Sequence, residues 1–279
     1  MDAKAYKKTI LSLSLGLLFL LDNQNAHADQ LEQVKKRGTL ICGVLGSVPP
    51  FGYQDPKTRE PIGYDIEMCK TIAQHLGVKP ELKVVAVPAR IPEVSQGRVD
   101  IVAGSLGWTP ARAEQIDFSF AYYKTLTVLG YSASTPYTSW AQFAGKRIAA
   151  GSATTSAAAA KEKIPQATLV TFDDISQVLL ALKQRKVDAV ALNEIFLQQY
   201  KKRTQGTPDA IDLLTDPPLF AETYGLGIKK GETALVNAVN DALLDADKKG
   251  ELDKIFDKFV GKDSEFNMTR RFKVEKIGE

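Results

Sequence analysis

Short apolar runs alternate with amphipathic segments along most of the chain. Residues 39–46 form an apolar run, and residues 65–77 then place apolar side chains three and four positions apart. This spacing is typical of a helix that buries one face. Two more strands are expected at 81–87 and 99–104, around a short helix at 91–97. The alternation predicts an α/β fold with mainly parallel sheets.

A second series of the same kind follows. It consists of strands at 147–151, 168–172 and 187–193, with helices that follow the loop from residue 152 and the turn at residue 174. QGRVDIVA at 96–103 and QRKVDAVA at 184–191 occupy equivalent places in the two series, each leading from a helix into a strand. The repetition predicts two similar lobes.

Two extended segments, 117–134 and 219–230, connect the two series. The chain is therefore expected to leave the first lobe, build the second and return. We assign residues 29–125 and 217–279 to lobe 1 and residues 126–216 to lobe 2, with the terminal helices packed on lobe 1. The last residues, from 264, show no helical periodicity and are expected on the surface.

The first 28 residues have the pattern of a secretory signal peptide. Three lysines precede the apolar run Ile10–Leu21, which ends before Ala26-His27-Ala28. A membrane-spanning helix needs about 20 apolar residues, and this run is shorter. We therefore expect export to the periplasm without insertion in the membrane. A net charge of +3 gives no basis for a nucleic-acid-binding surface.

Cysteine and histidine are scarce. Cys42 lies on an expected strand and Cys69 on the helix that follows it, so a disulfide and a pair of buried thiols both remain open. His75 is the one histidine after the predicted signal, and it lies at the end of a helix, where a structural role is favoured. This supply offers little for a zinc site or a catalytic triad, so neither a metal nor a cofactor is expected.

GSLGWTPARAEQIDFS, at 104–119, follows an expected strand and opens a short helix. Thr109 suits the N-cap and Pro110 the first helical position. Arg112 then falls in the first turn, where the helix already carries partial positive charge and free N–H groups. An arginine with these donors suits a carboxylate. The alternative is a surface arginine paired with Glu114 or Asp117.

Two further loops lie at carboxyl ends of strands, where ligands bind in open parallel sheets. GSATTS, at 151–156, offers the Thr154 and Thr155 hydroxyls at a helix start, and VDAVALNE ends in Asn193 and Glu194. One such loop in each lobe would form a cleft that closes on a small acid. The alternative for GSATTS is an ordinary turn between strand and helix.

GYDIEMCKTIAQHL, at 63–76, resembles the signature of bacterial extracellular solute-binding proteins, family 3, the periplasmic receptors of polar amino-acid ABC importers. Matching motifs follow in the same order over the mature chain: PPFGY, TPAR with IDFS, RIAAGSATTS, VDAVALNE and ETYGLGIKK. The resemblance implies a type II periplasmic binding protein with a hinge of two β-strands. It also implies a monomer that closes on its ligand and presents it to a membrane permease.

The resemblance also assigns roles in the site. Arg112 would hold the ligand α-carboxylate, with Thr109 and either Thr154 or Thr155 as further donors. The carbonyl or the side chain of Ser105 would help to hold the ammonium group. Arg90 matches the position at which members that bind aspartate or glutamate place a second arginine for the side-chain carboxylate. The alternative for Arg90 is a solvated residue at a helix start.

The sequence departs from the family pattern at two places. Asn193 stands where most members have an aspartate for the ligand ammonium, so either Glu194 or Glu222 substitutes, or the ligand is not a standard α-amino acid. Only Val48 and Val87 stand where an aromatic residue usually stacks on the ligand. An acidic amino acid, aspartate or glutamate, is the leading expected ligand.

Two alternatives to a transport receptor are an exported enzyme and a sensing domain. Some exported proteins of this fold are dehydratases of cyclohexadienyl acids such as arogenate and prephenate, and Glu222 in FAETYG matches the place of their general acid. A glutamate there is also common in receptors, so a binding protein rather than an enzyme is expected. The sensing domain of a membrane receptor is disfavoured, because no transmembrane helix or signalling domain follows.

Overall fold

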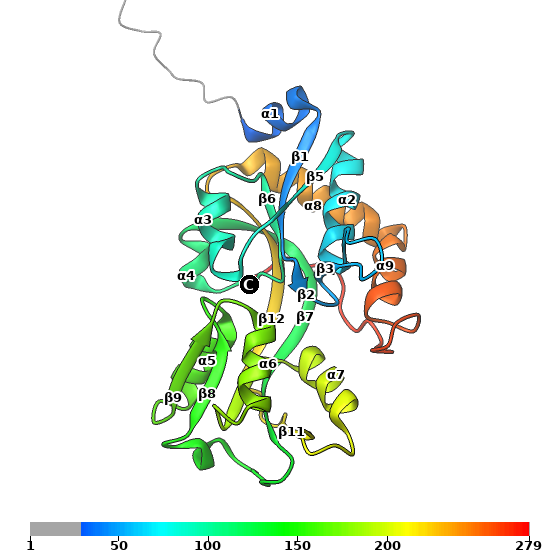
Figure 1. Ribbon diagram of the computed structural model, residues 1–279. Helices are drawn as coiled ribbons and strands as arrows, with labels where there is room; N and C mark the ends of the chain where they lie inside the picture. Colours follow the sequence, from blue (N-terminus) through cyan, green and yellow to red (C-terminus); the bar gives the residue numbers. More distant parts are fainter. Residues whose placement is uncertain (1–28, 279) are drawn as a thin grey trace, which may run out of the picture.

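The computed structural model describes residues 29–278, so the predicted signal peptide at 1–28 lies outside the described residues. Figure 1 shows two lobes joined by long strands that run through both of them. No helix in the described part of the chain is long and apolar enough to cross a membrane.

Lobe 1 is built on a parallel arrangement of β5 (Lys79–Val84), β1 (Thr39–Val44) and β6 (Ile101–Ala103). Helix α2 (Tyr64–Leu76) packs against β1 and β5, as its apolar face predicts. The other helices of this lobe are α1 (Gln30–Arg37), α3 (Arg90–Ser95), α4 (Pro110–Ala113), α8 (Thr233–Lys248) and α9 (Glu251–Phe259), with a 3-10 turn at Val87–Ala89. A small antiparallel sheet consists of β2 (Ser47–Val48), β3 (Gly52–Gln54) and β4 (Pro61–Ile62).

Lobe 2 repeats the parallel pattern. Strand β8 (Arg147–Gly151) pairs in parallel with β9 (Thr168–Phe172) and with β10 (Ala189–Asn193). Its helices are α5 (Thr155–Lys163), α6 (Ile175–Lys183) and α7 (Glu194–Thr204), with a 3-10 turn at Trp140–Phe143, and β11 (Ile211–Leu214) pairs with β7. Buried apolar clusters cover both faces of this part of the sheet.

Two antiparallel strands, β7 (Ile116–Ser132) and β12 (Phe220–Lys229), cross between the lobes. They unite both lobes in one sheet of order β5-β1-β6-β12-β7-β10-β8-β9. The predicted α/β fold with a two-strand hinge is therefore confirmed. The predicted lobe boundaries fall within β7 and just before β12, and they stay a prediction.

Aromatic rings gather on lobe 1 where these crossing strands meet its helices. The hinge aromatic cluster consists of Phe51, Tyr64, Tyr123, Tyr224 and Phe256. Their rings make edge-to-face and stacked contacts with one another. All five side chains are buried. Such contacts add to the stabilisation that burial provides.

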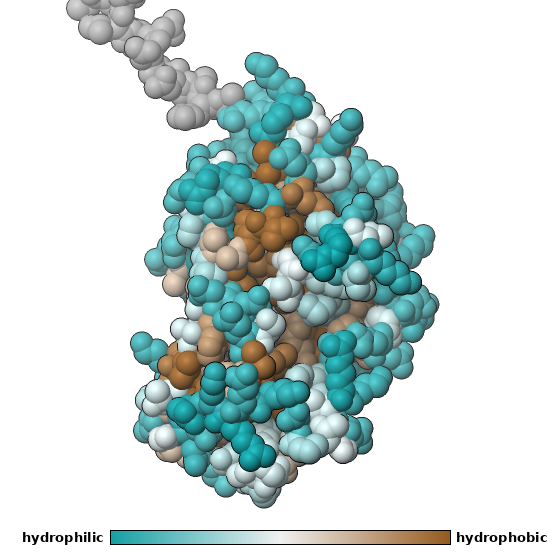
Figure 2. Space-filling view, viewed as in Figure 1, coloured by the Kyte–Doolittle hydropathy of each residue, from teal (hydrophilic) through white to brown (hydrophobic). Residues whose placement is uncertain are grey.

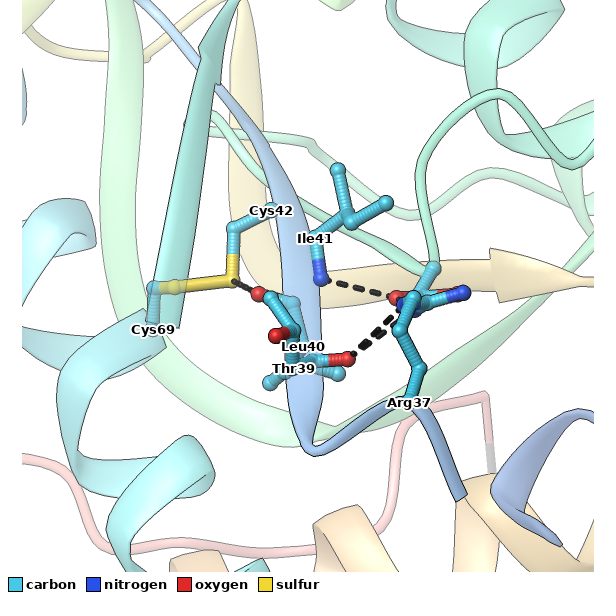
Figure 3. The surroundings of a disulfide bond; sticks show 7 residues. Arg37, Thr39, Leu40, Ile41, Cys42 and Cys69 are labelled. Atoms are coloured by element: carbon cyan, nitrogen blue, oxygen red, sulfur yellow. Dashed lines mark hydrogen bonds and ion pairs between the residues drawn. A yellow bond between two sulfur atoms is a disulfide. The ribbon is translucent and has the colours of Figure 1, made fainter. Parts of the chain in front are cut away.

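Cys42 of β1 and Cys69 of α2 form a disulfide, with their Cα atoms 6.3 Å apart (Figure 3). This settles the alternative that the sequence left open in favour of the bond. The bond lies inside lobe 1, where it ties the central strand to the helix that covers it. Figure 2 shows apolar residues gathered over β1 and β5 on the face drawn, where Val84 is exposed.

Asp65 stands at the start of α2, where an aspartate often caps a helix, but it does not do so here. The N-cap is Gly63, and no side chain caps this end. Asp65 is instead fully buried and accepts a hydrogen bond from the Tyr122 hydroxyl, at 2.7 Å. The Asp65 carboxylate thus binds the Tyr122 hydroxyl of β7 and not the backbone N–H groups at the start of α2 that a capping residue would bind.

Candidate functional site

A small cavity lies between the lobes, at the carboxyl ends of β1, β6, β8 and β10. Its volume is about 40 Å³, enough for about three water molecules. Lobe 1, lobe 2 and β12 all contribute to its wall, which consists of Leu45, Val48, Val87, Arg90, Ser105, Arg112, Thr154, Thr155, Ser156, Ile175, Leu192, Asn193, Phe196, Glu222 and Tyr224. The structure thus brings together the site residues expected from the sequence, except Thr109 and Glu194.

The lobes touch each other beside this cavity. Arg112 Nη2 donates to the carbonyl of Ala153 at 2.7 Å, and Ser47 Oγ donates to Asp174 at 3.3 Å. Arg112 and Ser47 belong to lobe 1, whereas the two acceptors belong to lobe 2. The structure is therefore a closed arrangement.

Arg112 is placed by the local signals that the sequence carries. Thr109 caps α4 by accepting from the Arg112 backbone N–H at 3.2 Å, and Pro110 begins the helix. The guanidinium turns inward, where Nη1 donates to the Gly107 carbonyl at 2.5 Å. Burial lowers the pKa of Arg112, while the nearby Glu222 opposes that change. The predicted alternative, a surface pair with Glu114 or Asp117, is not what the structure shows, because Asp117 pairs with Lys230.

Arg90 is also buried, with 4% of its surface exposed, so the alternative of a solvated residue is wrong. Its Nε donates to the Val87 carbonyl at 2.8 Å, and Nη1 donates to the carbonyls of Gly104 and Ser105 at 2.8 and 2.9 Å. Burial, together with the nearby Arg112, lowers the pKa of Arg90 to about 10. Three backbone oxygens therefore fix this guanidinium at the cavity wall.

Neither guanidinium forms an ion pair with any residue in the described part of the chain. Arg90 and Arg112 donate only to backbone carbonyls. Buried charges in proteins are normally paired, because desolvation is otherwise too costly. Two adjacent buried cations in a cavity wall therefore favour an anionic occupant.

Ser105 links Arg90 to the buried Asp65 through hydrogen bonds. It has a φ of 49°, and in this conformation its N–H and hydroxyl both donate to Asp65, at 2.7 and 3.1 Å. Its carbonyl meanwhile accepts from Arg90. Both groups that the resemblance offers for a ligand ammonium are thus engaged, the carbonyl with Arg90 and the hydroxyl with Asp65. In this structure Ser105 positions Arg90.

Asp65 should make stability depend on pH. Burial raises its pKa to about 6, from 3.8. The folded protein therefore holds a proton that the unfolded chain has lost, and stability falls as the pH rises from about 4 to about 6. We expect the parent protein to lose about 2.5 kcal/mol of unfolding free energy relative to Asp65→Asn between pH 4 and pH 7.

Urea unfolding at a series of pH values would measure this difference. Asp263→Asn, at an exposed position, is the matched control and should track the parent protein at every pH. A constant difference between the parent and Asp65→Asn across this range would contradict the assignment.

The opposite charge in the cavity comes from Glu222 on β12, which is 4% exposed. It accepts hydrogen bonds from the Thr155 hydroxyl and from Asn193 Nδ2, the latter at 2.6 Å. The Tyr224 hydroxyl donates to Asn193 Oδ1 at 2.8 Å, which directs the amide nitrogen toward Glu222. Burial raises the pKa of Glu222. A Cβ atom at Gly107 would lie 2.2 Å from Glu222 Oε1, so a larger residue there would displace the Glu222 carboxylate.

Thr154 and Thr155, in the loop at 151–156, have different roles. Thr154 caps α5, accepting from the Ala157 N–H at 3.1 Å, and donates to the Gly151 carbonyl at 2.7 Å. Thr155 is the one whose hydroxyl contacts Glu222. Of the two glutamates considered for the ammonium group, Glu222 lines the cavity, whereas Glu194 begins α7 and lines a separate groove.

Tyr224, Phe196 and Ile175 also line the cavity, although they were not expected there from the sequence. Tyr224 could have been found, because alternate residues of a strand share one face and it stands two positions after Glu222. Phe196 and Ile175 carry no comparable signal, since apolar residues near helix starts are equally expected in the core.

Comparisons with known proteins agree with this architecture. The family model of bacterial extracellular solute-binding proteins, family 3, matches residues 40–262. The ABC transporter glutamine-binding protein GlnH of Bacillus subtilis is 26% identical, over 86% of this chain and 88% of its own length. The L-glutamate/L-aspartate-binding protein of Pseudomonas aeruginosa is 27% identical, over 88% of this chain and 86% of its own length.

Among solved structures, the ancestral amino acid-binding protein AncCDT-1, described as a precursor of cyclohexadienyl dehydratase, superposes with a TM-score of 0.75. It is 29% identical and covers 83% of this chain and 99% of its own. The predicted type II periplasmic binding protein fold is thereby confirmed. The chain belongs to the bacterial extracellular solute-binding proteins, family 3.

Proposed function

We propose that the protein is a periplasmic receptor that captures an acidic amino acid, glutamate or aspartate, and delivers it to the permease of an ABC importer. The observation that carries this proposal is the charge of the cavity wall. It holds two buried guanidinium groups without an ion-pair partner in the described residues, and one buried carboxylate. An acidic amino acid has the complementary set, two carboxylates and one ammonium.

Arg112 is proposed to hold the α-carboxylate, because it stands at a helix start and contacts the second lobe directly. Arg90 is proposed to hold the side-chain carboxylate through its Nη2, which has no hydrogen bond in the described part of the chain. A neutral ligand such as glutamine would leave the Arg90 charge unpaired. Relatives include both glutamine-binding and glutamate/aspartate-binding proteins, so this position is what we expect to discriminate.

Glu222 is proposed to hold the ligand ammonium group in place of the missing aspartate. Asn193 cannot form an ion pair, but its amide and the Thr155 hydroxyl both bind the Glu222 carboxylate. Hydrogen bonds of this kind favour the ionised form and so oppose the effect of burial on the pKa. Val87 would line the ligand side chain, and Thr109 would act through its cap on α4.

Ligand binding is proposed to require separation of the lobes. The closed cavity of about 40 Å³ is too small for an amino acid. We propose that residues 29–125 with 217–279 rotate relative to residues 126–216 in a monomer. The predicted signal peptide at 1–28 would direct the chain to the periplasm.

Arg90→Gln should weaken L-glutamate binding by about ten- to a hundredfold, because it removes the partner of the side-chain carboxylate. L-Glutamine affinity should change much less, so the ratio of the two affinities reports on Arg90 specifically. Isothermal titration calorimetry measures both. Arg98→Gln, at an exposed position, is the matched control. An equal loss for both ligands would remove the acidic side chain from the proposal.

A thermal-shift screen with the common L-amino acids, prephenate and arogenate tests the function as a whole. A ligand at 100 times its dissociation constant should add about 2.7 kcal/mol of stability. Glu222 also has the burial and raised pKa of a general acid, which is why the two cyclohexadienyl acids are included. Turnover of either acid that is lost in Glu222→Gln would replace the receptor proposal with a dehydratase.

A further inference from the structure

The residues that follow α9 form an ordered tail, 263–278, which lies beyond the residues that match the family model. Arg270 fixes the tail to lobe 1 through Asp247 and Asp253, at 2.6 and 2.8 Å. Phe272 lies against Tyr123 and Phe256 of the hinge aromatic cluster, with centroids 5.2 and 5.8 Å apart. Most residues of the tail are exposed, as expected for a surface segment, but these contacts fix it in place.

The end of the tail passes across the two crossing strands (Figure 1, red trace). The Ala121 N–H of β7 donates to the Glu275 carbonyl at 2.7 Å, and Lys124 of β7 pairs with the Glu275 carboxylate. On β12, Ile277 lies close to Gly225: a Cβ atom added to this glycine would lie 2.9 Å from Ile277 Cδ1. The tail thus contacts both strands that must bend when the lobes rotate.

The start of the tail reaches lobe 2. Glu265 accepts hydrogen bonds from the side chains of Gln199 and Arg203 on α7, the latter at 3.2 Å. Lys202 Nζ lies 3.5 Å from the Glu265 carbonyl. Since residues 270–278 are fixed to lobe 1, the contacts of Glu265 with α7 connect one lobe to the other outside the hinge.

We propose that residues 263–278 are a strap that stabilises the closed arrangement of the lobes. Rotation of lobe 2 would move α7 relative to the anchored tail and break the Glu265 contacts. A series of contacts also links the tail to the cavity. Phe272 contacts Tyr123, and the Tyr123 ring stacks on Tyr224 with the centroids 5.6 Å apart. The Tyr224 hydroxyl in turn donates to Asn193 in the cavity wall. The strap thereby adjusts how readily the ligand-free cleft opens.

The test measures the distance between lobes without ligand. Spin labels on Gln96→Cys in lobe 1 and Gln177→Cys in lobe 2, both exposed, report open and closed populations by double electron–electron resonance. Protein refolded after removal of bound solutes should be used. Glu265→Gln is expected to raise the open-to-closed ratio roughly two- to fivefold, the range for loss of an exposed ion pair.

Two controls make the result specific. Asp263→Asn removes an equal charge from the same tail at a position without a contact to α7 among the described residues, and should leave the ratio unchanged. Arg203→Gln should match Glu265→Gln, and the double variant should add little to either. Equal ratios in Glu265→Gln and Asp263→Asn would overturn the strap. Because no ligand is involved, this outcome is independent of the proposed specificity.

Discussion

Arg112→Ala should lower the affinity for L-glutamate by about a thousandfold, while the ligand-free protein stays folded. The guanidinium can donate two charge-assisted hydrogen bonds to a carboxylate, each worth about 2 kcal/mol, and a total near 4 kcal/mol corresponds to that factor. The variant also loses the contact of Arg112 with the Ala153 carbonyl, which lies directly between the lobes. Binding and closure should therefore be weakened together.

Calorimetric titration with L-glutamate measures this loss, and circular dichroism checks the fold. Arg112→Lys is the informative companion, because it keeps the charge but loses the planar pair of donors, and we expect an intermediate affinity. Arg98→Ala should bind like the parent protein, since Arg98 is exposed on lobe 1. An affinity within tenfold of the parent in Arg112→Ala would remove this residue from the site.

Loss of the disulfide should cost about 3 to 4 kcal/mol of unfolding free energy. Cys42 and Cys69 are separated by 27 residues, and closing a loop of this length in the unfolded chain gives that figure in the chain-entropy model. The double variant Cys42→Ala, Cys69→Ala should unfold at lower urea concentration. L-Glutamate affinity should hold in conditions where the variant is folded, because neither cysteine lines the cavity.

The parent protein treated with a thiol reductant supplies the control for this variant. It should unfold like the double variant, whereas reductant should not change the double variant further. A loss below 1 kcal/mol would mean that structure retained in the unfolded chain already brings the two segments together.

The sequence predicted the features that depend on neighbouring residues. Thr109 and Pro110 start α4 because capping and a fixed φ act over a few positions. The order of strands and helices predicted the lobes, and strand ends identified the loops that carry Arg112 and Thr155. These features depend on residues that are close in the sequence and not on distant contacts, so the folded molecule retains them.

What the sequence could not supply depends on contacts between distant segments. Asp65 is removed from a capping role by Tyr122, 57 positions away. The partner of Asn193 is Glu222, 29 positions away, and only the closed sheet shows that the amide supports the carboxylate rather than replaces it. Propensity and spacing carry no information about such pairs.

The position of Glu222 on β12 has a mechanical consequence. In the proposed rotation of the lobes, a group on a strand that runs through both of them would lie close to the axis, so it would move little while the outer rims move far. Arg112, at the interlobe contact with Ala153, lies where the separation begins. In the proposed binding mode, the contacts with the ligand carboxylate would therefore break before those with the ammonium group as the cleft opens.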